Sequence, residues 1–400
     1  MNYYKYKMDR HVSSVSDQEL ERRWSVTQKY MADNDIDCII MFGFESKQGG
    51  AIRYYCDWPA DFCHYGSFLL VPREGGMALF AHGPFMNNAM PYGQRGIDLN
   101  FGAPFTPFWL SSKDYFPPPA VAWLKKRGYK KLGIYHPNMV PFYFTDYIMN
   151  NLEGATLTNV DEGIDAIRAV KSEEELALIR DVVRMHDRIF AAAPIFLRPG
   201  RLERDVAAEL KKASWDLGGE GFNVQICADP KKAKHKMFEF QNSVINEGDI
   251  VDLRVQVQGP GSYWGDLART WVVFGDPSKE LQKANDDSVK IQTQLAKLAV
   301  PGAKSSELRS ALQKFEKENG YMEQTGFFGH GQGTDVVERP AFQPEETMVL
   351  KENMVLSLHT GMETEATWSF NADNFLVTKK GAIRMNETAQ GILTNTFTAP

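Results

Sequence analysis

The chain has 400 residues, of which 43% are hydrophobic and 24% are charged. This length exceeds that of one ordinary domain, so we expect two domains, and the composition excludes a wholly disordered chain. The net charge of -6, from 45 basic and 51 acidic residues, leaves no basic excess to neutralise a nucleic-acid backbone. We therefore expect a folded protein that does not bind nucleic acid.

The N-terminal segment is polar and charged where a signal peptide needs an apolar run. No stretch of the sequence reaches the roughly 18 apolar residues of a membrane span. We therefore expect a soluble, cytoplasmic protein without a membrane partner.

Short apolar runs alternate with helical patterns in the first part of the chain. Apolar positions at helical spacing predict a helix over 17–34, and a buried strand follows over 36–44. The same strand signal recurs at 65–72, 76–82 and 131–137, with a helical segment at 120–128. These elements predict an N-terminal α/β domain over residues 1–160.

The second part of the chain begins with a long helical pattern. Within it, Ser172 is followed by three Glu residues, which is typical of an N-cap and an acidic first turn. Three further helices are expected, and a hairpin with a Gly-Pro-Gly turn lies between the first two of them. Short strands close the chain, so residues 161–400 are expected to form an α+β domain with a curved antiparallel sheet. The helices are predicted over 201–218, 278–300 and 305–320, the hairpin over 244–275, and the closing strands over 327–333, 354–363 and 368–378.

Several polar side chains in the second domain are of the kinds that bind ligands. Asp252 and Asp266 fall on neighbouring strands of the hairpin, and His330 lies in a glycine-rich turn where the backbone can approach a ligand closely. In IRAVKSEEELALIR, EGDIVDL, GDLARTWVVFG, GHGQGTDVVERP, ENMVLSLHTGM and NADNFLVTKKG, the chain resembles the pita-bread family (peptidase M24) of creatinases, methionine and proline aminopeptidases and prolidases. The resemblance covers essentially the whole chain and is most specific over 165–382. It implies a C-terminal pita-bread fold and an N-terminal creatinase-like α/β domain.

The resemblance also implies a metal site, from which this chain departs. In metallopeptidases of the family, two Asp, one His and two Glu hold two divalent metals. Asp252, Asp266 and His330 match the first three of these ligands, whereas His359 and Ala372 stand where the family has Glu. Because Ala372 has no donor atom, we expect no dinuclear cluster.

Two interpretations of the centre stay open. In the first, Asp266, His330 and His359, with Asp252 as a further candidate, hold one divalent transition metal, since imidazole and carboxylate suit such ions. In the second, no metal binds, and the polar groups of the pocket grip the substrate while His235 acts as the base.

Two further positions bear on the chemistry that the resemblance implies. His235 matches the place where creatinase, which uses no metal, keeps its general base, so we expect it to be catalytic together with Glu338. Glu338 has a second interpretation, as an ordinary ion-pair partner of a neighbouring Arg. Val337 replaces the His that metallopeptidases use on the scissile carbonyl, which argues against peptidase activity.

The resemblance implies a homodimer in which the partner's N-terminal domain completes the pocket. Side chains from the loop after residue 50 are therefore expected to contact substrate alongside groups of the second domain. The expected substrate-binding residues are His330, His359, Asp252, Asp373, Arg53, Tyr54, Trp58, His64 and Tyr65.

The leading hypothesis is a non-peptidase hydrolase of the creatinase-like group that cleaves a C–N bond in a small polar metabolite. Acidic and aromatic groups around the pocket favour a cationic substrate. Cleavage of another carbon–heteroatom bond, by a lyase, is a second possible reaction. Two competing hypotheses are an Xaa-Pro-type aminopeptidase or dipeptidase with an unusual mononuclear metal centre, and a catalytically inactive binding module.

Overall fold

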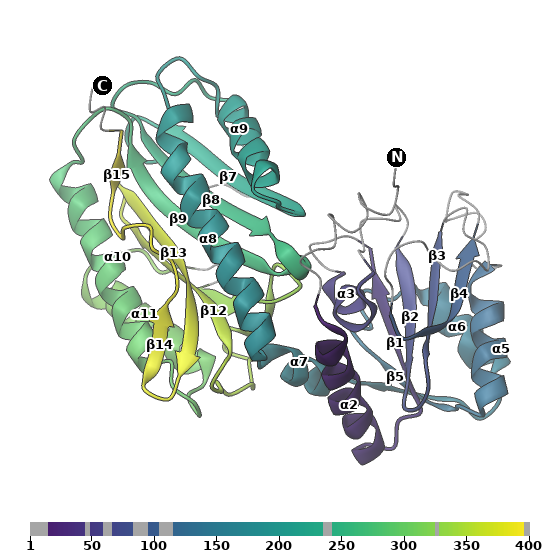
Figure 1. Cartoon of the computed structure of the whole chain (residues 1–400). Coiled ribbons are helices and arrows are strands. Elements are labelled where there is room, and N and C mark those ends of the chain that lie inside the picture. The colour runs from purple at the N-terminus through teal and green to yellow at the C-terminus, as the bar shows by residue number, and fades with distance from the viewer. Residues whose placement is uncertain are drawn as a thin grey trace. The chain divides into compact units, whose positions relative to one another are not determined.

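The computed structural model describes residues 15–44, 49–58, 66–82, 95–103, 115–234, 242–324 and 328–395. The chain divides by its contacts into two compact units, Met1–Arg168 and Ala169–Pro400 (Figure 1). In these described ranges, no helix is both long enough and apolar enough to cross a membrane.

The first unit contains a six-stranded mixed sheet in the order β4-β3-β2-β1-β5-β6. The central strand β1 pairs antiparallel with β2 and parallel with β5. The four predicted strands are confirmed, whereas β4 and β6 were not predicted because most of their side chains are partly exposed and carry little apolar signal. The strands are β1 (Cys38–Gly43), β2 (Ser67–Pro72), β3 (Met77–His82), β4 (Ile97–Ala103), β5 (Lys131–Ile134) and β6 (Thr156–Asn159).

Helices pack on both faces of this sheet. Alternate residues of β1 point to opposite sides, so Ile39 joins one apolar cluster and Ile40 the other. Helix α7 contributes Ile164 to the first of these clusters, although the expected boundary at residue 160 had assigned that helix to the second domain. The helices are α2 (Asp17–Asp33), α3 (Gly50–Cys56), α5 (Pro117–Arg127), α6 (Phe142–Asn151) and α7 (Asp161–Ala169).

In the second unit, the long helical pattern divides where the sequence carries its cap. Ser172 accepts a hydrogen bond from the Glu175 N–H at 3.2 Å, and the Glu175 carboxylate accepts one from the Ser172 N–H at 2.8 Å. This capping box satisfies two backbone donors and begins α8 as a helix separate from α7. The helices of this unit are α8 (Glu173–Phe196), α9 (Glu203–Asp216), α10 (Lys279–Leu298) and α11 (Ser305–Glu318).

The sheet of the second unit is antiparallel along the path β11-β10-β12-β13-β9-β8-β7. Strand β14 pairs with β13, and β15 pairs parallel with β9. This sheet and its covering helices confirm the expected α+β pita-bread architecture. The strands are β7 (Gly221–Asp229), β8 (Ile250–Gln258), β9 (Trp264–Val272), β10 (Gly329–Gly331), β11 (Glu338–Ala341), β12 (Val355–Glu363), β13 (Trp368–Thr378), β14 (Gly381–Arg384) and β15 (Leu393–Thr394).

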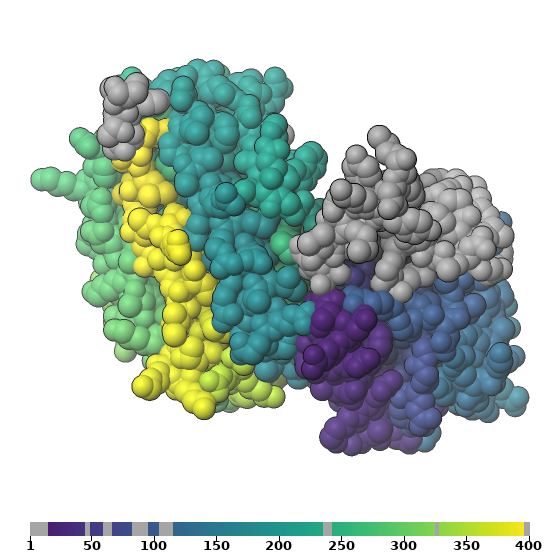
Figure 2. Space-filling model, in the orientation of Figure 1, coloured from purple at the N-terminus to yellow at the C-terminus, as the bar shows by residue number. Residues whose placement is uncertain are grey.

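Strand alternation gives this sheet an apolar face and a polar face. Val251, Leu253 and Val255 of β8 pack into the core beneath α8 and α9. The intervening residues of β8, Arg254 and Gln256, therefore point to the opposite face. On the side of the unit seen in Figure 2, α8 and the C-terminal strands beside it form part of the surface. Asp266, His330 and His359 gather on the polar face of the sheet.

One buried acid lies apart from this polar face, near the end of α11. Glu316 is fully buried, and its Oε2 accepts a hydrogen bond from the Gln324 N–H at 3.3 Å. Its Oε1 has no hydrogen-bond partner within the described part of the chain. Burial raises the pKa of Glu316 to about 7.

Glu316 therefore makes the stability of the protein depend on pH. Its folded-state pKa lies above the unfolded value. The free energy of unfolding is therefore undiminished by Glu316 below about pH 4.5, and it falls as the pH rises through about 7. At pH 8, we expect the free energy of unfolding of Glu316→Gln, measured by urea unfolding, to exceed that of the wild type by about 1 to 3 kcal/mol. Near pH 4.5 the two proteins should be equally stable. Glu318→Gln, on the exposed side of the same helix, is the control and should change neither value. An equal effect of Glu316→Gln at both pH values would contradict the assignment.

Candidate active site

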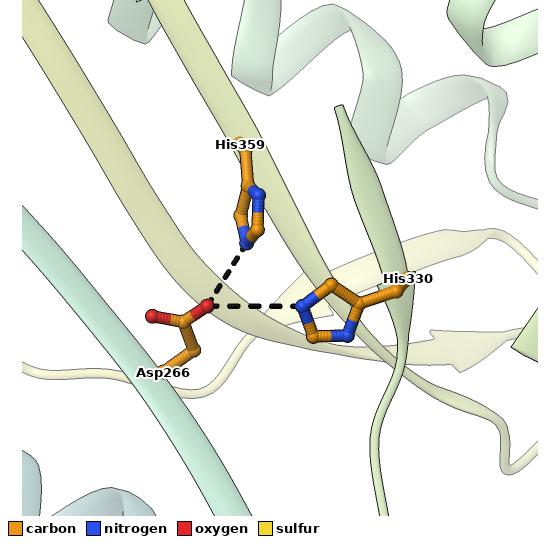
Figure 3. Close-up of side chains that lie close together, drawn as sticks. All are labelled: Asp266, His330 and His359. Atoms are coloured by element: carbon orange, nitrogen blue, oxygen red, sulfur yellow. Dashed lines mark hydrogen bonds and ion pairs between the residues drawn. The ribbon is translucent and has the colours of Figure 1, made fainter. Parts of the chain in front are cut away.

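Three strands bring the candidate side chains together. Asp266 comes from β9, His330 from β10 and His359 from β12. One nitrogen or oxygen atom from each lies within 4.8 Å of the others, and all three side chains are buried (Figure 3). The sheet thus assembles the three residues that the sequence proposed as a ligand set.

Asp266 is the acceptor at the centre of this cluster. Its Oδ2 accepts from His359 Nε2 at 2.9 Å and from Ser357 Oγ at 3.2 Å. Arg254 donates to both carboxylate oxygens, from Nε to Oδ1 at 2.9 Å and from Nη2 to Oδ2 at 2.5 Å. Gln256 Nε2 adds a longer contact to Oδ2 at 3.4 Å. Both oxygens of Asp266 therefore have donors within the protein.

The charges of this pair stabilise each other. Burial by itself would raise the pKa of Asp266, but the Arg254 charge and the hydrogen bonds from His359 and Arg254 hold it well below its usual value. Burial would likewise lower the pKa of Arg254, and the charge and hydrogen bonds of Asp266 raise it instead. The site therefore contains an ionised carboxylate and a charged guanidinium at neutral pH.

His330 presents an imidazole lone pair to the same carboxylate. Its Nδ1 lies 2.9 Å from the Gly331 carbonyl oxygen, which can only accept, so Nδ1 carries the proton of the neutral ring. Burial, reinforced by the neighbouring His359, lowers the pKa of His330 to about 3. Its Nε2 then faces Asp266 Oδ2 at 3.9 Å and has no hydrogen-bond partner within the described residues. Two acceptors so placed can share one donor between them.

Arg254 is a functional candidate that the sequence patterns did not single out. Register pairing places Asp266 opposite Gln256, and Arg254 lies two residues away on the same face of β8. A signal for it was present, because period-two alternation along 250–258 puts residues 252, 254 and 256 on one face. A search for carboxylates and imidazoles as ligands passes over the basic residue among them.

Asp252 lies on that face but further along the strand. It pairs in register with Thr270, four residues from the level of Asp266, which is about 13 Å along a strand. It is fully buried, and it is not among the side chains that converge on Asp266. The expected convergence of two carboxylates is therefore replaced by an Arg–Asp pair.

Ala372 lies where the resemblance implied a second Glu ligand. It is fully buried opposite Ala268, in an apolar cluster with Trp368 and Phe370. At the position of the expected second Glu ligand, the chain therefore places methyl groups and aromatic rings instead of a carboxylate.

The residues present fit a divalent ion in donor type but not in charge. Asp266, His330 and His359 form the group of the described chain that could hold a metal. The Arg254 guanidinium already bonds both oxygens of Asp266 and lies 3.2 Å from His359 Nε2. A divalent ion held by these atoms would lie beside that guanidinium and be repelled by its charge. The charge of Arg254 therefore disfavours a divalent ion in this arrangement of side chains.

Glu338 is held in a buried ion pair. Its Oε2 lies 2.9 Å from Lys171 Nζ, and its Oε1 accepts from the Asp335 N–H at 3.2 Å. Its partner is thus a Lys from the segment before α8, where a neighbouring Arg was expected. This pairing favours the structural interpretation of Glu338 over the catalytic one.

Asp373 also belongs to a structural network. Its Oδ1 accepts from Arg269 Nη2 at 2.7 Å and from Arg384 Nε at 3.0 Å. These bonds tie β13 to β9 and β14, and the Arg269 and Asp373 side chains are both fully buried. The Oδ1 atom of Asp373 thus serves the sheet, and the substrate-binding role of this residue stays a prediction.

The expected contributions from the first unit do not appear in its structure. Arg53, Tyr54 and Trp58 are buried, with exposures of 5%, 2% and 0%. Arg53 pairs with Asp57 at 2.7 Å, and Trp58 Nε1 donates to Ser67 Oγ at 3.3 Å. These three side chains pack inside their own unit, and the expectation that they reach a substrate stays a prediction. The remaining candidates, His64, Tyr65 and His235, lie outside the described residues.

Comparison with known proteins places this site in a family. The model of metallopeptidase family M24 matches residues 177–389, which contain the whole cluster. An Xaa-Pro dipeptidase of Pyrococcus horikoshii is 28% identical over 273 residues, 66% of this chain and 76% of the relative. A probable dipeptidase PepE of Mycobacterium tuberculosis is 28% identical over 226 residues, 55% of this chain and 59% of the relative.

Solved structures show the same fold. The prolidase of Pyrococcus horikoshii superposes with a TM-score of 0.75 at 22% identity, over 93% of this chain and all of that one. An X-Pro aminopeptidase of Thermotoga maritima gives a TM-score of 0.78 at 18% identity, over 93% and 99% of the two chains.

These relatives correct the leading functional hypothesis. A non-peptidase, creatinase-like enzyme was expected from the substitutions at Val337, His359 and Ala372. The curated relatives are instead named as dipeptidases, and the matched family is one of metallopeptidases. The expectation of a non-peptidase, which rested on three substituted positions, is therefore wrong.

The Arg254–Asp266 pair generates a prediction about stability. Asp266→Asn leaves the Arg254 charge buried without its main partner and should lower the free energy of unfolding by about 3–5 kcal/mol. The double variant Arg254→Met/Asp266→Asn should lose less than the sum of the two single losses, which urea unfolding of all four proteins measures. Asp216→Asn removes an exposed pair with Lys212 and should leave the free energy of unfolding unchanged. Strictly additive losses would mean that the pair is not coupled.

Proposed function

We propose that this chain, which belongs to metallopeptidase family M24, hydrolyses the peptide bond of short peptides as a dipeptidase. The family match includes every residue of the buried cluster, and the curated relatives over this region are named Xaa-Pro dipeptidase and probable dipeptidase. A peptide bond is a C–N bond, so this function keeps the hydrolase reaction expected from the sequence and replaces its substrate.

One observation carries the proposal. His330 Nε2 and Asp266 Oδ2 are both acceptors, and they face each other at 3.9 Å inside a buried site. A water molecule that donates a hydrogen to His330 Nε2, whose lone pair has no partner within the described chain, would be held beside Asp266 with its own lone pair directed away from the imidazole. Such a held and oriented water is what hydrolysis needs as its nucleophile.

The neighbouring groups support the rest of the reaction. Attack by water on the peptide carbonyl places negative charge on the carbonyl oxygen, and the Arg254 guanidinium is a donor beside Asp266. The leaving amine needs a proton, and His235 remains our hypothesis for the residue that takes a proton from water and returns it. A divalent metal, where a family member binds one, supplies Lewis-acid polarisation of the carbonyl.

For cofactors, we propose that no dinuclear cluster forms. The side chain of Ala372 supports this, since it has no donor atom and packs in an apolar cluster with Trp368 and Phe370. Of the two interpretations left open by the sequence, one ion or none, the charge of Arg254 supports the second. The homodimer stays a prediction, and the burial of Arg53, Tyr54 and Trp58 supports a pocket to which these three residues do not contribute.

The substrate class is tested by a panel assay. We expect the purified protein to release free amino acids from Xaa-Pro or other dipeptides, as measured by mass spectrometry. A parallel panel of small cationic metabolites without a peptide bond should give no product. Turnover of a metabolite together with inert dipeptides would contradict the proposed function.

Variants at the two histidines test the mechanism on any dipeptide that is turned over. His330→Ala removes the acceptor that holds the water, and His235→Ala removes the proposed base, so each should lower kcat by about 100-fold or more. Neither should change the unfolding midpoint greatly, which circular dichroism can check. His136→Asn is the control, because it alters a partly exposed His of the first unit at a positive φ that Asn tolerates. Unchanged kcat in His330→Ala would remove that residue from the reaction.

A further inference from the structure

Arg254 gives the centre of the site a permanent positive charge. Its guanidinium bonds both oxygens of Asp266, and its Nη2 lies 3.2 Å from His359 Nε2. Asp266 and His359 are two of the three side chains that a divalent ion would use. We infer that Arg254 is the resident cation of this site and takes the place of a divalent metal.

The geometry of the pair matches this role. A planar guanidinium donating two parallel N–H bonds to one carboxylate is the strongest form of this ion pair, and Arg stays charged at any physiological pH. Asp252, two residues away on the same strand, adds a second negative charge that acts on Arg254. The protein thus supplies the positive charge that its buried carboxylates require.

The remaining member of the cluster is consistent with a neutral ligand. His330 carries its proton on Nδ1 and offers an unprotonated Nε2 toward Asp266. A water molecule or an amide N–H can donate to His330 Nε2 without adding charge beside Arg254. A divalent ion at the same place would add two positive charges next to the guanidinium.

Arg254 also has donor capacity left for a substrate. No hydrogen bond of its Nη1 is present among the described residues, and 13% of its side chain is exposed. As water adds to a peptide carbonyl, the C=O electron pair moves to oxygen, and Nη1 is the group that would stabilise this oxyanion. Collapse of the intermediate re-forms C=O and breaks the C–N bond, and the amine leaves with the proton that water lost. This step rests on the proposed peptide substrate, whereas the charge argument does not.

Metal analysis tests the inference without any enzyme assay. The wild-type protein is purified from cells grown with added Mn²⁺, Co²⁺ and Zn²⁺ and then dialysed against metal-free buffer. We expect less than about 0.1 equivalent of metal by plasma mass spectrometry, and no change of Tm with millimolar Mn²⁺, Co²⁺, Zn²⁺ or EDTA. One retained equivalent, or a Tm lowered by EDTA, would overturn the inference.

Variants at position 254 test whether Arg254 is the cause. Arg254→Asp replaces the cation with a ligand-type carboxylate, so Mn²⁺ or Co²⁺ should now raise its Tm. Arg254→Gln removes only the charge and provides the same test if Arg254→Asp does not fold, as judged by circular dichroism. Arg339→Gln is the control. It disrupts a partly buried ion pair between Arg339, on β11, and Glu346, and the variant should stay unresponsive to metal. A folded Arg254→Asp or Arg254→Gln protein that ignores metal would show that something other than Arg254 excludes it.

The kcat of Arg254 variants on a dipeptide distinguishes a role of the Arg254 charge in the reaction from a role of its side chain in packing. Arg254→Gln should lower kcat by about 10²- to 10³-fold with a smaller change in KM, as expected for a lost oxyanion donor. Arg254→Lys keeps the charge and should retain more activity than Arg254→Gln. Equal losses in the two variants would indicate a merely structural role. If the wild type cleaves no dipeptide, the proposed function fails while the metal result still decides the role of Arg254.

Discussion

A buried ion pair between Arg254 and Asp266 is the interaction on which the site depends. Charged groups are costly to bury, and they remain ionised here because each satisfies the other through two hydrogen bonds. Ser357 and His359 complete the hydrogen bonding of Asp266. Both come from β12, which belongs to the same sheet as β8 and β9. The site is thus a polar network that the fold must assemble all at once.

The two-faced sheet is what makes that network possible. The apolar residues of β8 pack under α8 and α9, and the alternating residues of the same strand become the polar floor of the site. On β12, His359 turns to Asp266, while the hydroxyl of the next residue, Thr360, lies 3.0 Å from Ser288 Oγ of α10, so side chains of this strand also alternate between the two faces. A shift of one residue in either strand would exchange the faces and bury the charges in the apolar core.

The family comparison and the local chemistry carry different information. The fold and the matched segment place the chain among metallopeptidases, and this corrects a hypothesis drawn from a few substituted positions. The side chains at those positions nevertheless differ from a ligand set, since Arg254 lies against Asp266 and Ala372 packs against Ala268. A reaction class can outlast a change of cation, because what the transition state requires is positive charge near the carbonyl oxygen, whether from a metal or a guanidinium.

Much of the fold could be read from local patterns. The period-two and helical spacings predicted the central strands of both units, helices α2 and α5 of the first unit and the helices of the second, and Ser172 marked the start of α8, because these signals depend on near neighbours in the chain. Residue type selected Asp266 and His330, and the family resemblance added His359. These patterns could not pair Glu338 with Lys171, bury Trp58, or choose Arg254 over Asp252 as the partner of Asp266. Those outcomes depend on strand register and on contacts between residues far apart in the chain, which set the distances on which electrostatics acts.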